Sequence, residues 1–296
     1  MNVENYRRFL EGFGHRVIAS PSGYWFNVNR WFYQSIPPFR VIAPNQAEIS
    51  DLFSRHRVLG FKYCAPPNHS GKLSAIYICR DKGYDLKNVH RKMRNKVRQG
   101  LRNCTVRPIS FEYLYYHGMP LNRDTLKRQD RDDPTFSQQE QWERFCQAGQ
   151  EAQGAGVWGA FVGEQLAAYM VTFIIHGCSN ILYQMSRTDL LNSRANNALA
   201  FVATREMLSS PDIRCVSYGQ ESIRALPGLD EYKLRLGYER WPMRHVVVLH
   251  PLFKPFLLGW AGEAVLRNLR RFFPGRDVLK LITGVVDIAR QSQASG

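Results

Sequence analysis

Alternating apolar runs and polar turns in residues 155 to 250 predict an α/β fold. The segment VWGAFVGEQLAAYMVTFIIHG forms two strand patterns joined at Gly163-Glu164, and the second run is almost uninterruptedly apolar, as in a central strand. Further strands are expected at ILYQMSRT and RCVSYG, with a helix between them that begins near Asn192 or Ser193. A short helix in GLDEYKLRLGYE is stopped by Gly237, and RWPMRHVVVLHP follows as a closing strand.

The first half of the chain has a less regular pattern. A helix is predicted at NQAEISDLFSRHRVLG, and strands are predicted at KYCAPP and KLSAIYICR. The polar stretch QDRDDPTFSQQEQWERFCQAGQEA is expected to be a loop leading into a helix, with Ser137 as N-cap and Glu140 completing a capping box. We therefore expect an N-terminal α/β portion (1–105), a central domain (106–250) and a helical tail (251–296).

The segment HRKMRNKVRQGLRN, residues 90–103, predicts a strongly basic helix. It carries six Lys or Arg residues and no carboxylate. Val89, Met93, Val97 and Leu101 recur at steps of four and form one narrow apolar stripe, and Gly100 and Asn103 are expected to end the helix before a strand at CTVRPI. Two interpretations remain open: a solvated helix that packs by this stripe, or a polyanion-binding surface formed by Arg91, Arg94, Lys96 and Arg98.

The composition narrows the choice of partners. A net charge of +15 over 296 residues creates a positive field that attracts acidic partners, such as nucleic acid, acidic lipid or a phosphorylated cofactor. The six cysteines stand singly, as is typical of buried thiols in a reducing cytosol. Neither a CxxC pair nor an HExxH helix occurs, so we predict no metal.

The two ends of the sequence bear on localisation. The start, MNVENYRRFLEGFGHR, lacks the apolar stretch of a signal peptide, and PFLLGWAG is too short to span a bilayer, so a cytoplasmic protein is expected. The C-terminal tail predicts a basic amphipathic helix that either lies on the inner face of an anionic membrane or packs on the fold or a second subunit. Its basic residues are Arg267, Arg270, Arg271, Arg276 and Lys280.

The order strand, strand, strand, helix, strand, helix, strand, closed by GLDEYKLRLGYE, resembles the GNAT (Gcn5-related N-acyltransferase) superfamily over residues 155–250. The pair Tyr232-Lys233 ahead of Gly237, together with the basic helix, looks more like the Fem-type branch, the peptidoglycan aminoacyltransferases and their relatives. This resemblance implies a GNAT-like mixed sheet flanked by helices. Because Fem-type proteins usually carry two GNAT-like domains in tandem, the N-terminal portion is compatible with a degenerate second copy.

The segment LNSRANNA stands where the resemblance places the phosphate loop of the acyl donor. The first-turn amides of a helix lack intrahelical partners and the helix dipole adds positive charge, so this loop is a candidate anion site. It has no glycine, unlike the Arg/Gln-x-x-Gly-x-Gly/Ala loop usual in acetyl-CoA-using members, which puts acyl-CoA as the cofactor in question. An Asn/Ser cap without ligand is the plainer interpretation. The candidate donor-binding residues are Leu190, Asn192, Ser193, Arg194, Ala195, Asn196 and Asn197.

Acyl transfer to an amine requires a deprotonated amine, a polarised carbonyl and a protonated leaving group. Glu221, just after RCVSYG, is our candidate for the base or acceptor-orienting carboxylate. Lys233 could hold the oxyanion or a donor phosphate, and the phenol of Tyr232 could protonate the leaving group. Each also has an ordinary interpretation, namely a surface Glu, a solvated amine and a packed ring.

The sequence thus predicts an N-acyltransferase. It would move an acyl or aminoacyl group from a CoA-type or tRNA-type donor to an amine on a small molecule or peptide. The alternative is a catalytically inactive GNAT-fold protein that binds RNA or another polyanion through its basic helix.

Overall fold

The computed structural model describes residues 2–56, 58–221, 228–259, 262, 264, 284 and 286–292. The chain forms two compact units, each discontinuous in sequence, whereas the predicted division at residues 105 and 250 is linear. Unit 1 comprises the described residues of Met1–Gly14, Tyr77–Gly219 and Gly228–Arg240, and unit 2 those of His15–Ile76, Gln220–Pro227 and Trp241–Gly296. The tail residues predicted to meet a membrane, Arg267, Arg270, Arg271, Arg276 and Lys280, lie outside the described residues.

Unit 1 is built on strands in the spatial order β6-β7-β8-β9-β10. Strands β6 to β9 pair antiparallel, with the predicted tight turn at Gly163 between β7 and β8. β10 instead runs parallel to β9, and the two pair at three positions only. The bounds are β6 Thr105–Ile109, β7 Ala155–Val162, β8 Gln165–Ile175, β9 Cys178–Ser186 and β10 Cys215–Gln220.

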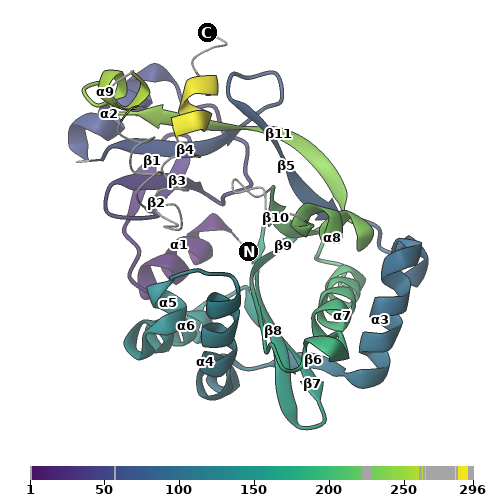
Figure 1. Ribbon diagram of the computed structural model, residues 1–296. Coiled ribbons are helices and arrows are strands. Elements are labelled where there is room, and N and C mark those ends of the chain that lie inside the picture. Colours follow the sequence, from purple (N-terminus) through teal and green to yellow (C-terminus); the bar gives the residue numbers. More distant parts are fainter. Residues whose placement is uncertain are drawn as a thin grey trace. The chain divides into compact units, whose positions relative to one another are not determined.

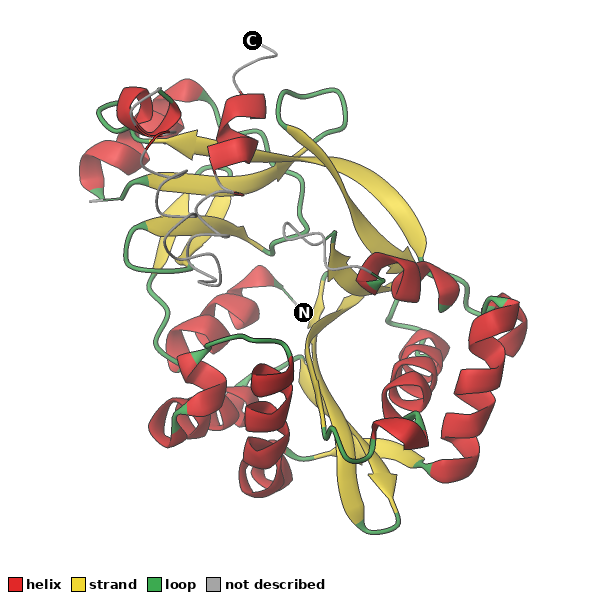
Figure 2. Ribbon diagram, in the orientation of Figure 1, coloured by secondary structure: helices red, strands yellow, loops and turns green. Residues whose placement is uncertain are grey.

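Two groups of helices cover the opposite faces of these strands (Figures 1 and 2). On one face, Phe9 lies 5.7 Å from Phe145 and 5.4 Å from Phe173 between ring centroids, so the first helix of the chain packs onto unit 1. That group is α1 Val3–Gly12, α4 Phe111–Arg128, α5 Pro134–Ser137 and α6 Gln139–Glu151. The other face carries α3 Arg91–Asn103 and α7 Ala195–Ser209.

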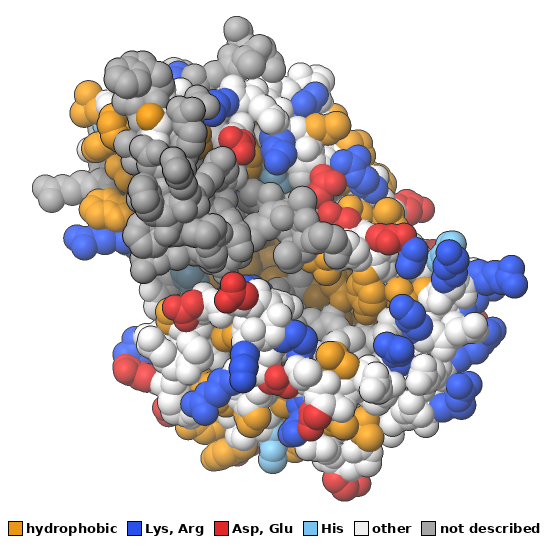
Figure 3. All heavy atoms as spheres, in the orientation of Figure 1, with side chains coloured by type: hydrophobic (Ala, Val, Ile, Leu, Met, Phe, Trp, Pro, Cys, Tyr) orange, Lys and Arg blue, Asp and Glu red, His pale blue; other side chains and the backbone are white. Residues whose placement is uncertain are grey.

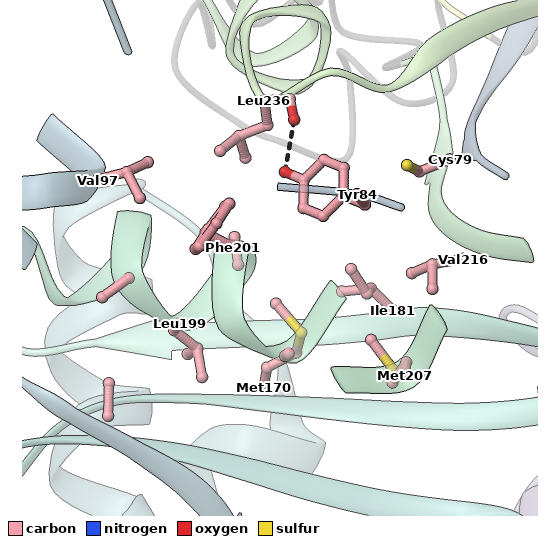
Figure 4. Packing of buried hydrophobic residues seen from close by; sticks show 14 of the residues in the cluster. Cys79, Tyr84, Val97, Met170, Ile181, Leu199, Phe201, Met207, Val216 and Leu236 are labelled. Carbon is pink, nitrogen blue, oxygen red and sulfur yellow. Dashed lines mark hydrogen bonds between the residues drawn. The ribbon is translucent and has the colours of Figure 1, made fainter. Parts of the chain in front are cut away.

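The core under α3 and α7 is a continuous apolar cluster (Figure 4). Val97 of α3 and Leu199 and Phe201 of α7 are almost completely buried in it. The phenol of Tyr84 donates to the carbonyl of Leu236 at 2.6 Å, which attaches the end of α8 (Leu229–Arg235) to this core. The predicted stop at Gly237 is confirmed: its φ of +92° suits glycine, and a Cβ there would lie 2.7 Å from the Asn88 carbonyl oxygen.

Several local predictions were wrong for identifiable reasons. Gly100 does not end the basic helix but lies inside it, where its lack of a side chain permits close packing. Leu101 of the predicted stripe is 37% exposed. Ser137 caps no helix, because it is the last residue of α5, and Gln138 precedes α6 instead. Helix α4 was missed, since its interior Pro120 and many polar residues disguise the helical pattern.

Unit 2 has the strand order β1-β2-β3-β4-β11, with β3 and β4 parallel and the other pairs antiparallel. Its core packs around Trp25 and Phe61, whose ring centroids lie 5.1 Å apart. The predicted helix and strands of the N-terminal portion are present as α2, β4 and β5. The bounds are β1 Val17–Ser20, β2 Gly23–Asn27, β3 Phe32–Ile36, α2 Gln46–Arg55, β4 Gly60–Ala65, β5 Lys72–Cys79, β11 Glu239–Leu249 and α9 Lys254–Leu258. Within the described part of the chain, no helix is long and apolar enough to span a bilayer.

Lys82 caps the C-terminal end of α7. Its ammonium donates to the carbonyl oxygens of Leu208 at 3.1 Å, Ser210 at 2.7 Å and Ile213. A positive charge at this end complements the helix dipole. We expect Lys82→Met to lower the free energy of unfolding by about 1 kcal/mol, measured by urea denaturation beside the exposed-lysine control Lys92→Met. Equal stabilities of the two variants would contradict this role.

Candidate donor-binding site

The candidate site begins where β9 leads into α7. A short 3₁₀ turn, Leu191–Ser193, precedes Arg194, which has a left-handed φ of +64° and forms the N-cap of the 15-residue α7. The carbonyl of Arg194 accepts the N–H groups of Asn197 and Ala198. The N-terminal end of a long helix, with its partial positive charge, therefore lies at this loop, which we call the donor loop (residues 190–194).

The polar side chains predicted to donate to a phosphate have partners inside the protein. Ser193 donates through Oγ to the Leu190 carbonyl at 2.6 Å. Asn196 donates to the hydroxyl of Ser186 at 3.0 Å, and Asn197 to the sulfur of Met93 at 3.0 Å. These side chains shape the donor loop and hold the helix in place. An anion here would be met by main-chain N–H groups and by Arg194.

Arg194, a candidate donor-binding residue, has unused hydrogen-bonding capacity. Its Nε atom is buried and has no hydrogen-bond partner among the described residues. A buried guanidinium nitrogen without an acceptor is costly. Its position at the start of α7 suits an acceptor oxygen supplied by a ligand such as phosphate.

The basic helix packs directly against the donor loop. A Cβ on Gly100 would lie 2.6 Å from the Arg194 carbonyl oxygen and 3.0 Å from Ala198 Cβ, so the two helices touch through their backbones. Gln99 donates to the carbonyl of Asn192, and Asn103 to that of Ser193, both at 3.3 Å. The basic helix is therefore part of the donor site's framework.

The positive charges of α3 fall into separate groups. Lys92 and Lys96 precede Gln99 by seven and three residues, which places all three on the side of the helix that faces the donor loop. Arg91 and Arg98 lie roughly a third of a turn further round. All four charged side chains are exposed, and Lys and Arg side chains gather over α3 in Figure 3.

Two residues of α3 change the predicted polyanion surface. Arg94 donates to the carbonyls of Val89 at 2.7 Å and Lys87 at 3.0 Å, so it supports the start of its own helix. Lys92 was not predicted. Its spacing from Gln99 could have indicated it, but the contact between Gln99 and the donor loop is visible only in the folded protein.

Tyr232 of α8 reaches the first turn of α7. Its hydroxyl donates to the main-chain carbonyl of Asn196 at 3.1 Å, and its ring meets that of Tyr218 edge-on. Tyr218 in turn donates to Gln184, whose amide donates to the Asn196 side chain at 2.8 Å. Burial raises the pKa of Tyr232, and the neighbouring Tyr218 hydroxyl offsets this only in part, so the phenol is protonated at neutral pH.

The side chains of Lys233 and Tyr232 point in different directions. The residue is only 3% exposed, and its ammonium lies 3.3 Å from Asp230 Oδ1 and 4.5 Å from the centroid of the Tyr77 ring. A buried ammonium needs such compensation. These contacts join α8 to β5, so the structure brings Tyr232 to the first turn of α7 and turns the Lys233 ammonium toward Asp230 and Tyr77.

Glu221, the predicted base, follows β10 and belongs to unit 2 rather than to unit 1. Its main-chain N–H donates to the Ala75 carbonyl at 2.8 Å. The fold thus assembles the donor loop, Tyr232 and α3 within unit 1, whereas Glu221 is held by its own unit. Among the described residues, no three His, Cys, Asp or Glu side chains cluster as metal ligands would.

No protein-family model matches the chain, and no curated protein matches its sequence. Solved structures do match. The chain is similar to FemX, with a TM-score of 0.58 and 9% identity over 84% of this chain and 92% of FemX. It is also similar to L-PGS from Bacillus licheniformis, with a TM-score of 0.56 and 12% identity over 97% of both chains.

A third similar structure is the C-terminal domain (DUF2156) assigned to a lysylphosphatidylglycerol synthetase from Agrobacterium fabrum. Its TM-score is 0.56, with 11% identity over 90% of this chain and 92% of that one. At such identities the likeness establishes the fold alone. The predicted GNAT-like fold is confirmed, and FemX shares it.

Proposed function

We propose that the protein is an N-acyltransferase that takes an aminoacyl group from a tRNA-type donor and passes it to an amine on a small molecule or peptide. Two of the similar structures carry names in keeping with aminoacyl transfer: FemX, and a lysylphosphatidylglycerol synthetase, named for a lysyl-bearing product. The proposal concerns this chain's own donor site, and its support comes from the charges there.

The observation that carries the proposal is the packing of the basic helix on the donor loop. The α7 N-terminus and Arg194 suit one phosphate group. Lys92 and Lys96 extend the positive surface along α3 beyond that point, on the side facing the loop. A polynucleotide offers phosphates at successive positions along such a surface. A compact CoA pyrophosphate would instead bind more closely to a loop that contains glycine, and the donor loop contains none.

In the proposed reaction, the acceptor amine attacks the ester carbonyl and the ribose hydroxyl leaves. Main-chain N–H groups and Arg194 would hold donor phosphate, fixing the ester relative to the first turn of α7. Tyr232, protonated because its pKa is raised, can donate a hydrogen bond to the departing oxygen in exchange for its bond to the Asn196 carbonyl. The proton lost by the amine ends on the departing ribose oxygen; Glu221, in unit 2, remains only the sequence-based candidate for the base, and Lys233 is a positioning residue for α8.

The donor assignment can be tested by removing two charges from either side of α3. We expect Lys92→Ala/Lys96→Ala to weaken binding of bulk aminoacyl-tRNA about tenfold or more and to reduce the salt slope of binding by about 2, because each lysine meets a phosphate. The matched control, Arg91→Ala/Arg98→Ala, removes the same charge from the other side and should have a much smaller effect. Filter binding at several salt concentrations measures both quantities.

Transfer is followed in the same samples as loss of radiolabelled amino acid from tRNA in the presence of amine acceptors. Equal weakening by the two double variants would contradict a donor-side surface and indicate nonspecific attraction. Salt-dependent tRNA binding without release of the label would favour the inactive RNA-binding alternative. A thermal shift with acetyl-CoA, lost in Arg194→Ala and absent with tRNA, would replace the tRNA-type donor by a CoA-type donor.

A further inference from the structure

Cys178 and Cys215 are direct cross-strand neighbours. They are the first of the three residue pairs that join β9 to β10 in parallel. Neighbouring strands lie about 4.7–4.9 Å apart, which is inside the Cα separation that a disulfide spans, about 4.4–6.8 Å. The register alone therefore brings these two residues within disulfide distance.

Both thiols lie on the same face of these strands. The next pair in register is Ser179 and Val216: Ser179 donates to Met207 of α7, and Val216 is buried in the α7 cluster. Because side chains alternate along a strand, Cys178 and Cys215 project from the opposite face. Each thiol is the largest influence on the pKa of the other, as is expected of close neighbours.

The surroundings distinguish the two sulfurs. Both cysteines are half-buried, whereas Cys64, Cys79, Cys104 and Cys146 are buried. The Cys178 thiol, together with the positive charges of Arg80 and Arg214, lowers the pKa of Cys215, while the Cys215 thiol and burial raise the pKa of Cys178. Arg214 is held in place because its guanidinium donates to the His176 carbonyl at 2.5 Å.

We infer that Cys178 and Cys215 form a redox-active pair, a modification site that closes to a disulfide with a low-molecular-weight disulfide such as oxidised glutathione. The inference is independent of the acyl-transfer proposal. It rests on the strand register, the shared face and the partial exposure of the two cysteines. The sequence pattern predicted buried thiols, whereas these two cysteines are partly exposed.

The reaction balances as two thiol–disulfide exchanges. The Cys215 thiolate attacks one sulfur of oxidised glutathione, forming a mixed disulfide and releasing one glutathione thiolate. Cys178 then loses its proton and attacks the Cys215 sulfur, which expels the second glutathione thiolate. The two protein thiols are oxidised, one glutathione disulfide is reduced to two glutathiones, and the two thiol protons pass to the released thiolates.

The test uses the full-length wild-type protein equilibrated with mixtures of reduced and oxidised glutathione, trapped with acid and analysed by peptide mass mapping. The expected result is a Cys178–Cys215 cross-linked peptide that disappears with dithiothreitol. It should be accompanied by a rise in Tm of about 2 °C or more, because the new bond closes a loop through β9, α7 and β10.

Single-cysteine variants test the assigned order. Cys178→Ser should stop at glutathione bound to Cys215, and Cys215→Ser should react far more slowly, while the buried-cysteine control Cys146→Ser should still form the cross-link. A wild-type protein that keeps both thiols reduced, or that accumulates glutathione on Cys215 with Cys178 present, would overturn the proposal. Because these outcomes are read on the wild type, misfolding of a variant cannot produce them.

Discussion

Lowering the pH from 7 to 5 is expected to reduce the free energy of unfolding by about 2 kcal/mol through one residue, His245. This histidine of β11 is 2% exposed, and its Nε2 atom is buried without a hydrogen-bond partner among the described residues. Burial, assisted by the positive charges of Lys62 and Lys72, lowers its pKa to about 3. Protonation inside the fold is therefore strongly disfavoured.

The fall in the free energy of unfolding at low pH follows from proton linkage. Below the unfolded-state pKa of about 6.5, the unfolded chain binds a proton that the folded protein excludes, so stability falls by about 1.4 kcal/mol for each further pH unit. The stability is fully present above pH 6.5 and is lost progressively as the pH falls toward 3. The effect acts in unit 2, where β11 pairs with β4.

Urea denaturation of wild type and His245→Gln at pH 7 and pH 5 measures this contribution. The variant should lose less stability on acidification than wild type, even where its stability at pH 7 is lower. Lys72→Met removes one neighbouring positive charge and should give an intermediate pH dependence. If wild type and His245→Gln have the same pH dependence, the histidine is not the acid-sensitive group.

Gly100→Ala is expected to destabilise the protein by about 1–3 kcal/mol and to weaken donor binding. In an open helix this change would stabilise by about 0.5–1 kcal/mol, because alanine favours helix over glycine. Here the new methyl group would meet the Arg194 carbonyl oxygen at 2.6 Å and Ala198 at 3.0 Å. Since the first neighbour is backbone, α3 and the donor loop must move apart.

Whether Gly100→Ala lowers or raises the free energy of unfolding therefore tests how closely α3 packs against α7. Asn95→Ala, on the exposed side of the same helix, raises helix propensity without meeting a neighbour and should be neutral or slightly stabilising. Urea denaturation compares the two variants, and filter binding of aminoacyl-tRNA reports the donor loop. A stabilised Gly100→Ala protein would show that α3 and α7 do not pack as closely as described.

Much of unit 1 could be predicted from sequence because its elements carry strong local signals. The apolar run of β8 and the turn at Gly163 identify a hairpin whatever surrounds them. Gly237 marks the end of α8 because its left-handed backbone suits glycine alone. The GNAT-like order of elements followed from such signals, whereas α4, with Pro120 in its interior, gave no clean helical pattern.

Only part of the arrangement of the candidate site could be predicted. The α7 N-terminus, Arg194 and Tyr232 were identified from residue type and position, and the fold brings all of them together in unit 1. Ser193, Asn196 and Asn197 were predicted as ligand donors, but hydrogen-bond partners within the protein engage them, three residues away for Ser193 and ten or more for the two asparagines. Residue type indicates what a side chain can bind, and only its neighbours decide what it does bind.

By itself, the sequence determined the α/β class, the order of strands and helices in residues 155–250, the basic helix and the loop before α7, since periodicity, turn residues and charge are local properties. Tertiary structure decided the rest. Gly100 was a predicted helix end until α7 was seen against it, and Cys178 and Cys215 were lone cysteines until β9 and β10 paired. These roles depend on contacts between residues far apart in the chain, which no local pattern encodes.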